Sequence, residues 1–180
     1  MKAVFLDRDG TIIVDPPDLR VDRISKIHLF PDVFKAMKRL AGLNYKVFIV
    51  TNQAGIAEGR ITEADFHRLN DILMELLEPT GVKIAKTYFC PHAQDGNCDC
   101  RKPKPKLLLD AATEFKIDDM ANSYSIGDHE SDIQAGIAAG TKTILVKTGN
   151  HEVTSTEADH TAADLLEAVE YIAAHDGSAG

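Results

Sequence analysis

The chain alternates between short apolar runs and longer segments whose apolar residues recur at helical spacing. The short runs are rich in β-branched residues and predict buried strands at residues 3–6, 46–50, 84–89, 123–126 and 143–146. The longer segments predict helices at residues 32–41, 62–78, 106–115, 132–139 and 157–174. Alternating strands and helices are typical of an α/β fold with a central parallel sheet and helices on both faces. We therefore expect one domain over residues 1–180, with a disordered tail from residue 175.

Polar side chains follow three of the predicted strands. They are Asp7, Asp9 and Thr11 after the first strand, Thr51 and Asn52 after the second, and Asp128 and Asp132 after the fourth. In open α/β sheets ligands bind at the carboxyl ends of the strands, so these side chains are expected to face one crevice. Two carboxylates as close as Asp7 and Asp9 favour a divalent cation and a phosphate group between them. The alternative is a solvated acidic turn.

A long polar segment, residues 12–31, separates the first strand from the first helix and contains Pro16 and Pro17. Long loops in compact domains are often lids or binding loops. A surface loop without a function is an equally supported alternative.

Three cysteines and one histidine lie within eleven residues after the third strand. Cys90 and His92 form a C-x-H pair, and Cys98 and Cys100 form a C-x-C pair, on either side of a five-residue polar loop. Together they provide a complete Cys₃His set for tetrahedral zinc, and because protein fills all four positions the zinc is predicted to be structural. The odd number of cysteines argues against a disulfide framework. Three free thiols near a chance histidine are the alternative.

Four cations follow the zinc loop, at Arg101, Lys102, Lys104 and Lys106. Such a run is often a solvated surface. Here the zinc loop and two prolines are expected to hold the cations at the end of a strand, which favours binding of an anion such as phosphate.

The composition and net charge of the chain exclude some classes of binding partner. The 180 residues are 44% hydrophobic and 27% charged, and the net charge of −8 argues against duplex nucleic acid or an anionic membrane as a partner. No apolar run reaches membrane-spanning length, and because Met1 and Lys2 lead directly into the first predicted strand we expect no signal peptide. We expect a cytoplasmic protein that works as a monomer, because its own loops could shield the site.

Four stretches together resemble the signatures of the haloacid-dehalogenase-like (HAD) phosphohydrolases. They are D-x-D-G-T at residues 7–11, Thr51 after an apolar strand, Lys102, and G-D-x-x-x-D at residues 127–132. The resemblance covers nearly the whole chain. It implies a Rossmann-like domain without a large cap domain, and a Mg²⁺-dependent phosphomonoesterase acting on a small phosphorylated metabolite.

The resemblance also implies a role for each site residue. Asp7 would be the nucleophile that forms an aspartyl-phosphate, and Asp9 the general acid and base. Asp7, Asp128 and the backbone carbonyl of Asp9 would hold Mg²⁺. The remaining roles are charge stabilisation by Thr51 and Lys102, substrate binding by Thr11, Asn52 and Arg101, and support of the metal shell or of Lys102 by Asp132.

The zinc loop followed by Cys100-Arg101-Lys102-Pro103 is similar to one subgroup, the heptose-bisphosphate phosphatases and histidinol-phosphate phosphatases. Residues 50–57 and 143–149 resemble the D-glycero-D-manno-heptose 1,7-bisphosphate 7-phosphatases, and this is the predicted activity. Residues 16–23 and 121–124 are more similar to the histidinol-phosphate branch, which makes histidine biosynthesis the alternative. A polynucleotide-end phosphatase and a non-catalytic phosphate sensor are further alternatives.

Overall fold

The computed structural model describes residues 1–150 and 157–176. In these residues the chain forms a parallel six-stranded sheet with the strand order β3-β2-β1-β4-β5-β6. The strands are β1 (Ala3–Leu6), β2 (Lys46–Asn52), β3 (Ile84–Cys90), β4 (Tyr124–Gly127), β5 (Lys142–Val146) and β6 (His160–Ala162). Together with the helices described below, this sheet confirms the predicted α/β fold.

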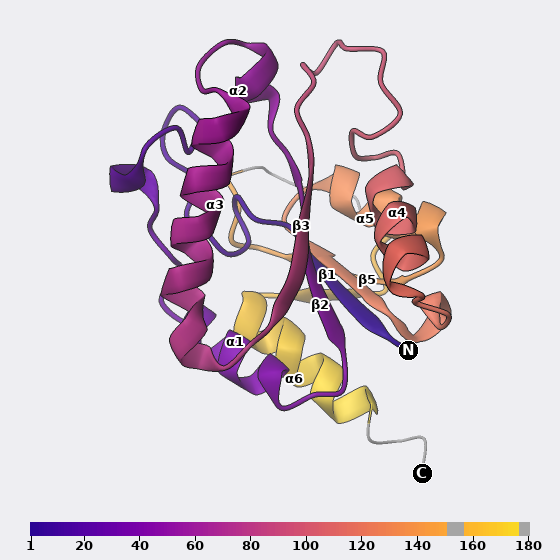
Figure 1. The fold of residues 1–180 in the computed structure, drawn as a ribbon. Helices are drawn as coiled ribbons and strands as arrows, with labels where there is room; N and C mark the ends of the chain where they lie inside the picture. Colours follow the sequence, from indigo (N-terminus) through magenta and orange to yellow (C-terminus); the bar gives the residue numbers. More distant parts are fainter. Residues whose placement is uncertain (151–156, 177–180) are drawn as a thin grey trace.

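Helices cover both faces of the sheet (Figure 1). They are α1 (Val33–Ala41), α2 (Ala54–Ala57), α3 (Glu63–Leu77), α4 (Lys106–Phe115), α5 (Glu130–Ala139) and α6 (Leu165–Asp176), with 3-10 turns η1 (Ile24–Lys26), η2 (Glu78–Thr80) and η3 (Met120–Asn122). No helix in the described residues is long and apolar enough to cross a membrane.

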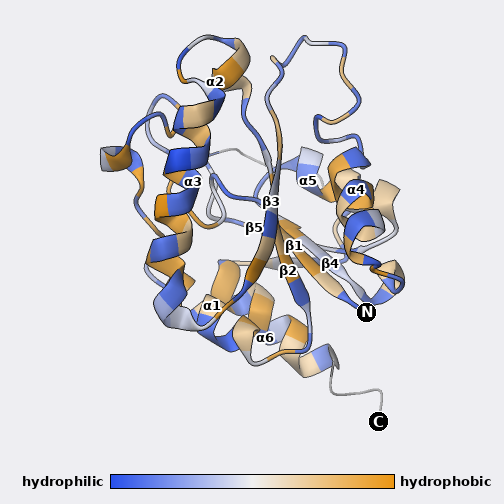
Figure 2. Cartoon of the chain, viewed as in Figure 1, coloured by the Kyte–Doolittle hydropathy of each residue, from blue (hydrophilic) through white to orange (hydrophobic). Residues whose placement is uncertain are grey.

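The core has two halves, one on each face of the sheet. Successive side chains of a strand point to opposite faces. Val4 and Leu6 of β1 therefore pack with α1, α6 and the end of α3, whereas Ala3 and Phe5 pack with α4 and α5. Hydrophobic residues gather along the strands and on α1 and α6 in Figure 2. Burial on both faces explains why the strands are continuous apolar runs.

The sheet changes its direction of winding between β1 and β4. β2 and β3 lie on one side of β1, and β4, β5 and β6 lie on the other. Such a switch point leaves a crevice at the carboxyl ends of the two central strands. In Figure 1, α2 and the loop between β3 and α4 both project beyond this end of the sheet. The fold therefore provides an open crevice bordered by two projecting segments.

The structure corrects three boundaries. β2 extends to Asn52, so Thr51 and Asn52 lie in the strand and not after it. The predicted helix at residues 157–174 is wrong in its first part, where the three-residue strand β6 pairs with β5 at the sheet edge. A strand this short has no apolar run to mark it. α6 continues through Asp176, which corrects the predicted tail at residues 175 and 176, and residues 177–180 lie outside the described residues.

The segment at residues 12–31 is irregular apart from η1, yet it is anchored. Ile13 is buried and forms an isolated bridge with Leu29. The Lys26 ammonium pairs with the carboxylates of Asp18 and Asp22 at 2.6 and 3.0 Å. The bridge and the ion pairs hold the segment together, and Ile13 and Val21 anchor it to the rest of the fold because both belong to the core.

We expect Thr62→Ala to lower the free energy of unfolding by about 1 kcal/mol, measured by urea denaturation. Thr62 and Asp65 form a capping box at the start of α3. The Thr62 hydroxyl accepts a hydrogen bond from the Asp65 backbone N–H, and the Asp65 carboxylate accepts one from the Thr62 N–H. Alanine leaves the Asp65 N–H without this partner.

Thr113→Ala is the matched control. The Thr113 hydroxyl lies inside α4 and donates to the Leu109 carbonyl oxygen of the same helix. Alanine is favoured inside helices, so this change should leave stability equal or slightly raised. Equal losses in both variants would contradict the capping role.

Candidate active site

A cavity of about 280 Å³ opens at the carboxyl ends of the central strands. The predicted site residues that line it are Asp7, Asp9, Thr51, Asn52, Arg101, Lys102, Asp128 and Asp132. Four residues of the segment at 12–31 also line it, namely Asp15, Leu19, Arg20 and Val21. This placement supports the interpretation of that segment as a binding loop.

The Lys102 ammonium lies at the centre of the site. Its Nζ is 2.7 Å from Asp7 Oδ1 and 2.6 Å from Asp132 Oδ1, and it donates to the Val50 carbonyl oxygen at 2.7 Å. Lys102 is only 5% exposed. Burial opposes its charge, but the two carboxylates outweigh this effect and raise the pKa of Lys102 above its usual value. Lys102 is therefore a permanent cation beside Asp7, and Asp132 supports it.

Asn52 and Thr51, at the end of β2, have different partners: Asn52 binds the backbone of Lys102, and Thr51 binds the side chain of Gln53. The Asn52 amide donates to the Lys102 carbonyl oxygen at 3.2 Å, and its Oδ1 accepts from the Lys102 backbone N–H at 3.1 Å. Asn52 thus also fixes the backbone that carries Lys102. The buried Thr51 hydroxyl oxygen accepts from Gln53 Nε2 at 2.9 Å.

Two residues that the sequence did not single out, Arg8 and Gln53, hold the Asp9 carboxylate. Arg8 is 1% exposed, and its Nε and Nη2 donate to both carboxylate oxygens of Asp9 at 2.9–3.2 Å. Gln53 Nε2 donates to Asp9 Oδ2 at 2.7 Å. The Arg8 guanidinium also lies 5.3 Å from the centre of the Phe66 ring. A cation placed between two acids at a buried strand end was the signal available for Arg8.

Thr11 was expected to bind substrate, and the structure corrects this. Thr11 is fully buried, and its hydroxyl donates to Asp128 Oδ1 at 3.2 Å. The tight turn at Gly10, whose φ is +80°, directs the Thr11 side chain inward. Thr11 therefore positions Asp128.

Gly10 and Gly149 both lie against the Asp128 carboxylate. A Cβ atom at either position would collide with it. The Thr148 hydroxyl donates to the Gly10 carbonyl oxygen at 2.6 Å and joins the two segments. The sequence analysis missed Gly149, although its place shortly after a strand end was a signal.

The buried carboxylates fit a divalent cation. Oxygen atoms of Asp7, Asp128 and Asp132 lie within 4.8 Å of one another. Burial, opposed by Lys102, raises the pKa of Asp7 to about 7, and burial together with the Asp7 charge raises the pKa of Asp128 to about 9. The single positive charge of Lys102 does not offset the negative charge of three carboxylates. A hard cation with oxygen ligands would offset the remainder.

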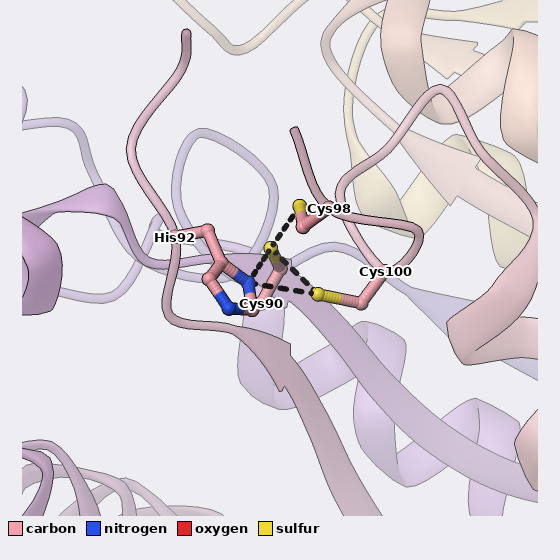
Figure 3. A group of neighbouring side chains, drawn as sticks. All are labelled: Cys90, His92, Cys98 and Cys100. Carbon is pink, nitrogen blue, oxygen red and sulfur yellow. Dashed lines mark hydrogen bonds between the residues drawn. The ribbon is translucent and has the colours of Figure 1, made fainter. Parts of the chain in front are cut away.

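The predicted zinc ligands converge in space (Figure 3). The sulfur atoms of Cys98 and Cys100 lie 3.6 and 3.0 Å from that of Cys90, and His92 Nδ1 lies 3.5 and 3.2 Å from the sulfur atoms of Cys90 and Cys100. Tetrahedral zinc with Zn–S bonds of about 2.3 Å separates its sulfur ligands by roughly 3.8 Å. Burial raises the pKa of the Cys90 thiol to about 12, so a metal cation is needed to keep it a thiolate. The cluster fits zinc.

This cluster is joined directly to the cavity. Arg101 and Lys102 follow Cys100 without a break, and both line the cavity. Arg101 Nη1 donates to the His92 carbonyl oxygen at 3.4 Å. The loop that carries the Cys₃His cluster thus holds two cations of the site in place.

Comparison with known proteins agrees with this geometry. A family model described as HAD-hydrolase-like matches residues 99–170. The D-glycero-α-D-manno-heptose-1,7-bisphosphate 7-phosphatase of Campylobacter jejuni is 42% identical over 145 residues, which cover 81% of each chain. The D-glycero-β-D-manno-heptose-1,7-bisphosphate 7-phosphatase of Escherichia coli K12 is 43% identical over 156 residues, covering 82% of this chain and 80% of that one. The chain belongs to the HAD-like hydrolases.

The HAD-like fold is also seen in solved structures. The D,D-heptose 1,7-bisphosphate phosphatase from B. bronchiseptica, complexed with magnesium and phosphate, superposes with a TM-score of 0.89 at 30% identity. The match covers 97% of this chain and 99% of that one. The predicted membership of the HAD family is confirmed.

We expect one zinc ion per chain, and we expect Cys98→Ser to lose it and to lower the unfolding temperature by roughly 5–10 °C. A structural metal site contributes directly to folding, and about 3 kcal/mol corresponds to this shift in a chain of this length. Elemental analysis and thermal unfolding measure the two effects. Asp95→Asn, an exposed change in the same loop, is the control. Unchanged zinc content and stability in Cys98→Ser would exclude the site.

We expect Gly149→Ala to lower kcat/KM for an aryl phosphate by about 100-fold, because the added Cβ displaces the Asp128 carboxylate. Gly42→Ala is the control, since a Cβ there meets nothing closer than the Arg39 carbonyl oxygen at 3.4 Å. Activity of Gly149→Ala within about threefold of the wild type would contradict the role of Asp128.

Proposed function

We propose that this HAD-like chain is a Mg²⁺-dependent phosphomonoesterase, a D-glycero-D-manno-heptose 1,7-bisphosphate 7-phosphatase. The observation that carries the proposal is the Asp7 carboxylate held 2.7 Å from the buried Lys102 ammonium, in a cavity of a chain 43% identical to the E. coli phosphatase. The named relatives favour the heptose-bisphosphate branch over the histidinol-phosphate branch.

The reaction has two halves. A carboxylate oxygen of Asp7 forms a bond to phosphorus while the bond from phosphorus to the sugar oxygen breaks, which gives an aspartyl-phosphate. The leaving alkoxide takes a proton from Asp9. Asp9 then takes a proton from water, whose oxygen attacks phosphorus and releases phosphate and the Asp7 carboxylate. Every proton and bond is accounted for by Asp7, Asp9 and one water.

Neighbouring groups orient these two acids. Arg8 and Gln53 hold the Asp9 carboxylate from two sides. Lys102 and Thr51 stabilise charge on the transferring oxygens, which is the larger part of catalysis in phosphoryl transfer. Arg101 contacts the substrate from the zinc loop.

Asp7, Asp128 and the backbone carbonyl of Asp9 would hold Mg²⁺. Bound there, Mg²⁺ supplies positive charge that offsets the repulsion between phosphate and carboxylates. Thr11 and Gly149 keep Asp128 in position for this task. The Cys₃His cluster would hold a structural Zn²⁺.

We also infer that residues 1–180 act as one catalytic domain, as a monomer in the cytoplasm, on a small phosphorylated sugar. The net charge of −8 supports a small-molecule substrate over nucleic acid.

Phosphate release in the presence of Mg²⁺ tests the proposal, with heptose 1,7-bisphosphate and histidinol phosphate compared side by side. We expect kcat/KM to be at least about 100-fold higher for the bisphosphate, since buried polar groups matched to one substrate reject the other. Asp7→Asn should lower activity by more than about 10³-fold with folding intact by circular dichroism.

Asp71→Asn, an exposed change on α3, is the control and should leave activity unchanged. Preference for histidinol phosphate would overturn the proposed substrate. Near-wild-type turnover by Asp7→Asn would overturn the nucleophile assignment.

A further inference from the structure

One wall of the cavity is not used by the reaction described above. It carries Arg20, which comes from the segment at residues 12–31 and lines the same cavity as Asp7 and Lys102. We propose that Arg20 binds the second, non-reacting phosphate of the bisphosphate substrate. The proposal rests on the proposed function and names the residue that distinguishes a bisphosphate from a monophosphate.

The Arg20 guanidinium is held ready for a ligand. Its Nε and Nη2 donate to the two carboxylate oxygens of Glu58 at 3.2 and 2.9 Å, and its Nη1 donates to the Leu19 carbonyl oxygen at 2.9 Å. These contacts use three of the five N–H groups of a guanidinium and leave two for a ligand. The planar arrangement of these donors matches phosphate oxygens.

Glu58 does not cancel the positive charge of this wall. Its carboxylate also lies 3.1 Å from Arg60 Nε, so one acid serves two guanidinium groups. Among the described residues, Arg20 lines the cavity and Glu58 and Arg60 do not. The remaining positive charge is therefore presented to the cavity by Arg20.

The backbone around Arg20 is fixed on both sides. Lys26 Nζ donates to the Arg20 carbonyl oxygen at 3.0 Å, and the following residue, Val21, is only 5% exposed. Leu19 has a φ of +54°, in the left-handed region that leucine rarely adopts. This conformation accompanies the contact between the Leu19 carbonyl oxygen and the guanidinium. Strained backbone of this kind clusters at ligand clamps.

Arg101 supplies a second cation to the same cavity. In the described part of the chain it forms no ion pair, and its one hydrogen bond from the side chain goes to the His92 carbonyl oxygen. Lys102, in contrast, is already paired with Asp7 and Asp132 deep in the site. Arg20 and Arg101 therefore lie in the cavity outside the group formed by Lys102, Asp7 and Asp132, and a second phosphate would give both guanidinium groups a ligand.

Arg20→Gln tests the proposal with two substrates, heptose 1,7-bisphosphate and heptose 7-phosphate, which lacks the second phosphate. For the bisphosphate we expect KM to rise and kcat/KM to fall by about 10- to 100-fold, the effect of losing one charge-assisted partner. For the monophosphate, kcat/KM should change by less than about threefold. Arg20→Lys keeps the charge without the planar donors and should lie between Arg20→Gln and the wild type for the bisphosphate alone.

Arg23→Gln is the matched control, because Arg23 lies in the same segment, is 65% exposed and pairs with Asp22. Arg23→Gln should leave kcat/KM unchanged for both substrates. Equal losses for both substrates in Arg20→Gln, or no loss for either, would overturn the role of Arg20 while leaving the proposed function intact. A wild-type enzyme that releases phosphate from an aryl phosphate but not from the bisphosphate would instead overturn the proposed function, and this proposal with it.

Discussion

The buried positive charge of Lys102 is the constraint on which the site depends. Burying a charge is costly unless partners surround it, and removing one partner of such a group costs more than the contact itself contributes. The partners of Lys102 come from three separate elements: Asp7 follows β1, Val50 belongs to β2, and Asp132 belongs to α5. The ammonium is satisfied only when all three are assembled. The Asp7 carboxylate is therefore placed by the same contacts that stabilise the centre of the fold.

The loop that carries the Cys₃His cluster also helps to hold Lys102 in the site. Lys102 follows Cys100 by two residues, and Asn52 on β2 binds the Lys102 backbone through two hydrogen bonds. A lysine on a free loop would lose rotational and backbone freedom each time it entered the site. Here the Cys₃His cluster, which would hold zinc, lies on one side and a strand on the other, and together they remove that freedom in advance. A polar loop becomes a rigid support without adding a cap domain.

Much of this organisation was predictable from the sequence, because it depends on strand ends. Parallel strands with polar residues at their carboxyl ends must direct those residues to one edge, so Asp7, Thr51 and Asp128 could be placed together before any coordinates. What could not be predicted depends on side-chain direction. Thr11 faces Asp128 because the Gly10 turn directs it inward, and nothing in its residue type shows this. The same holds for Gln53, whose partner Asp9 is known only once the turn is folded. The strand β6 was not predicted because it is a three-residue edge strand without an apolar run.

Gly10 and Gly149 approach the Asp128 carboxylate from opposite ends of the chain, and Thr148 ties them together. The ribosome makes β1 first, yet this central strand must wait for β4 to pair on its second side and for residue 149 to close over Asp128. A nascent chain that has reached only the end of α5 holds all the acids of the site without the segment that encloses them. Catalytic competence therefore arrives late in synthesis, and hydrolysis of a phosphate ester reports that the polypeptide has been made, and folded, at least as far as its fifth strand.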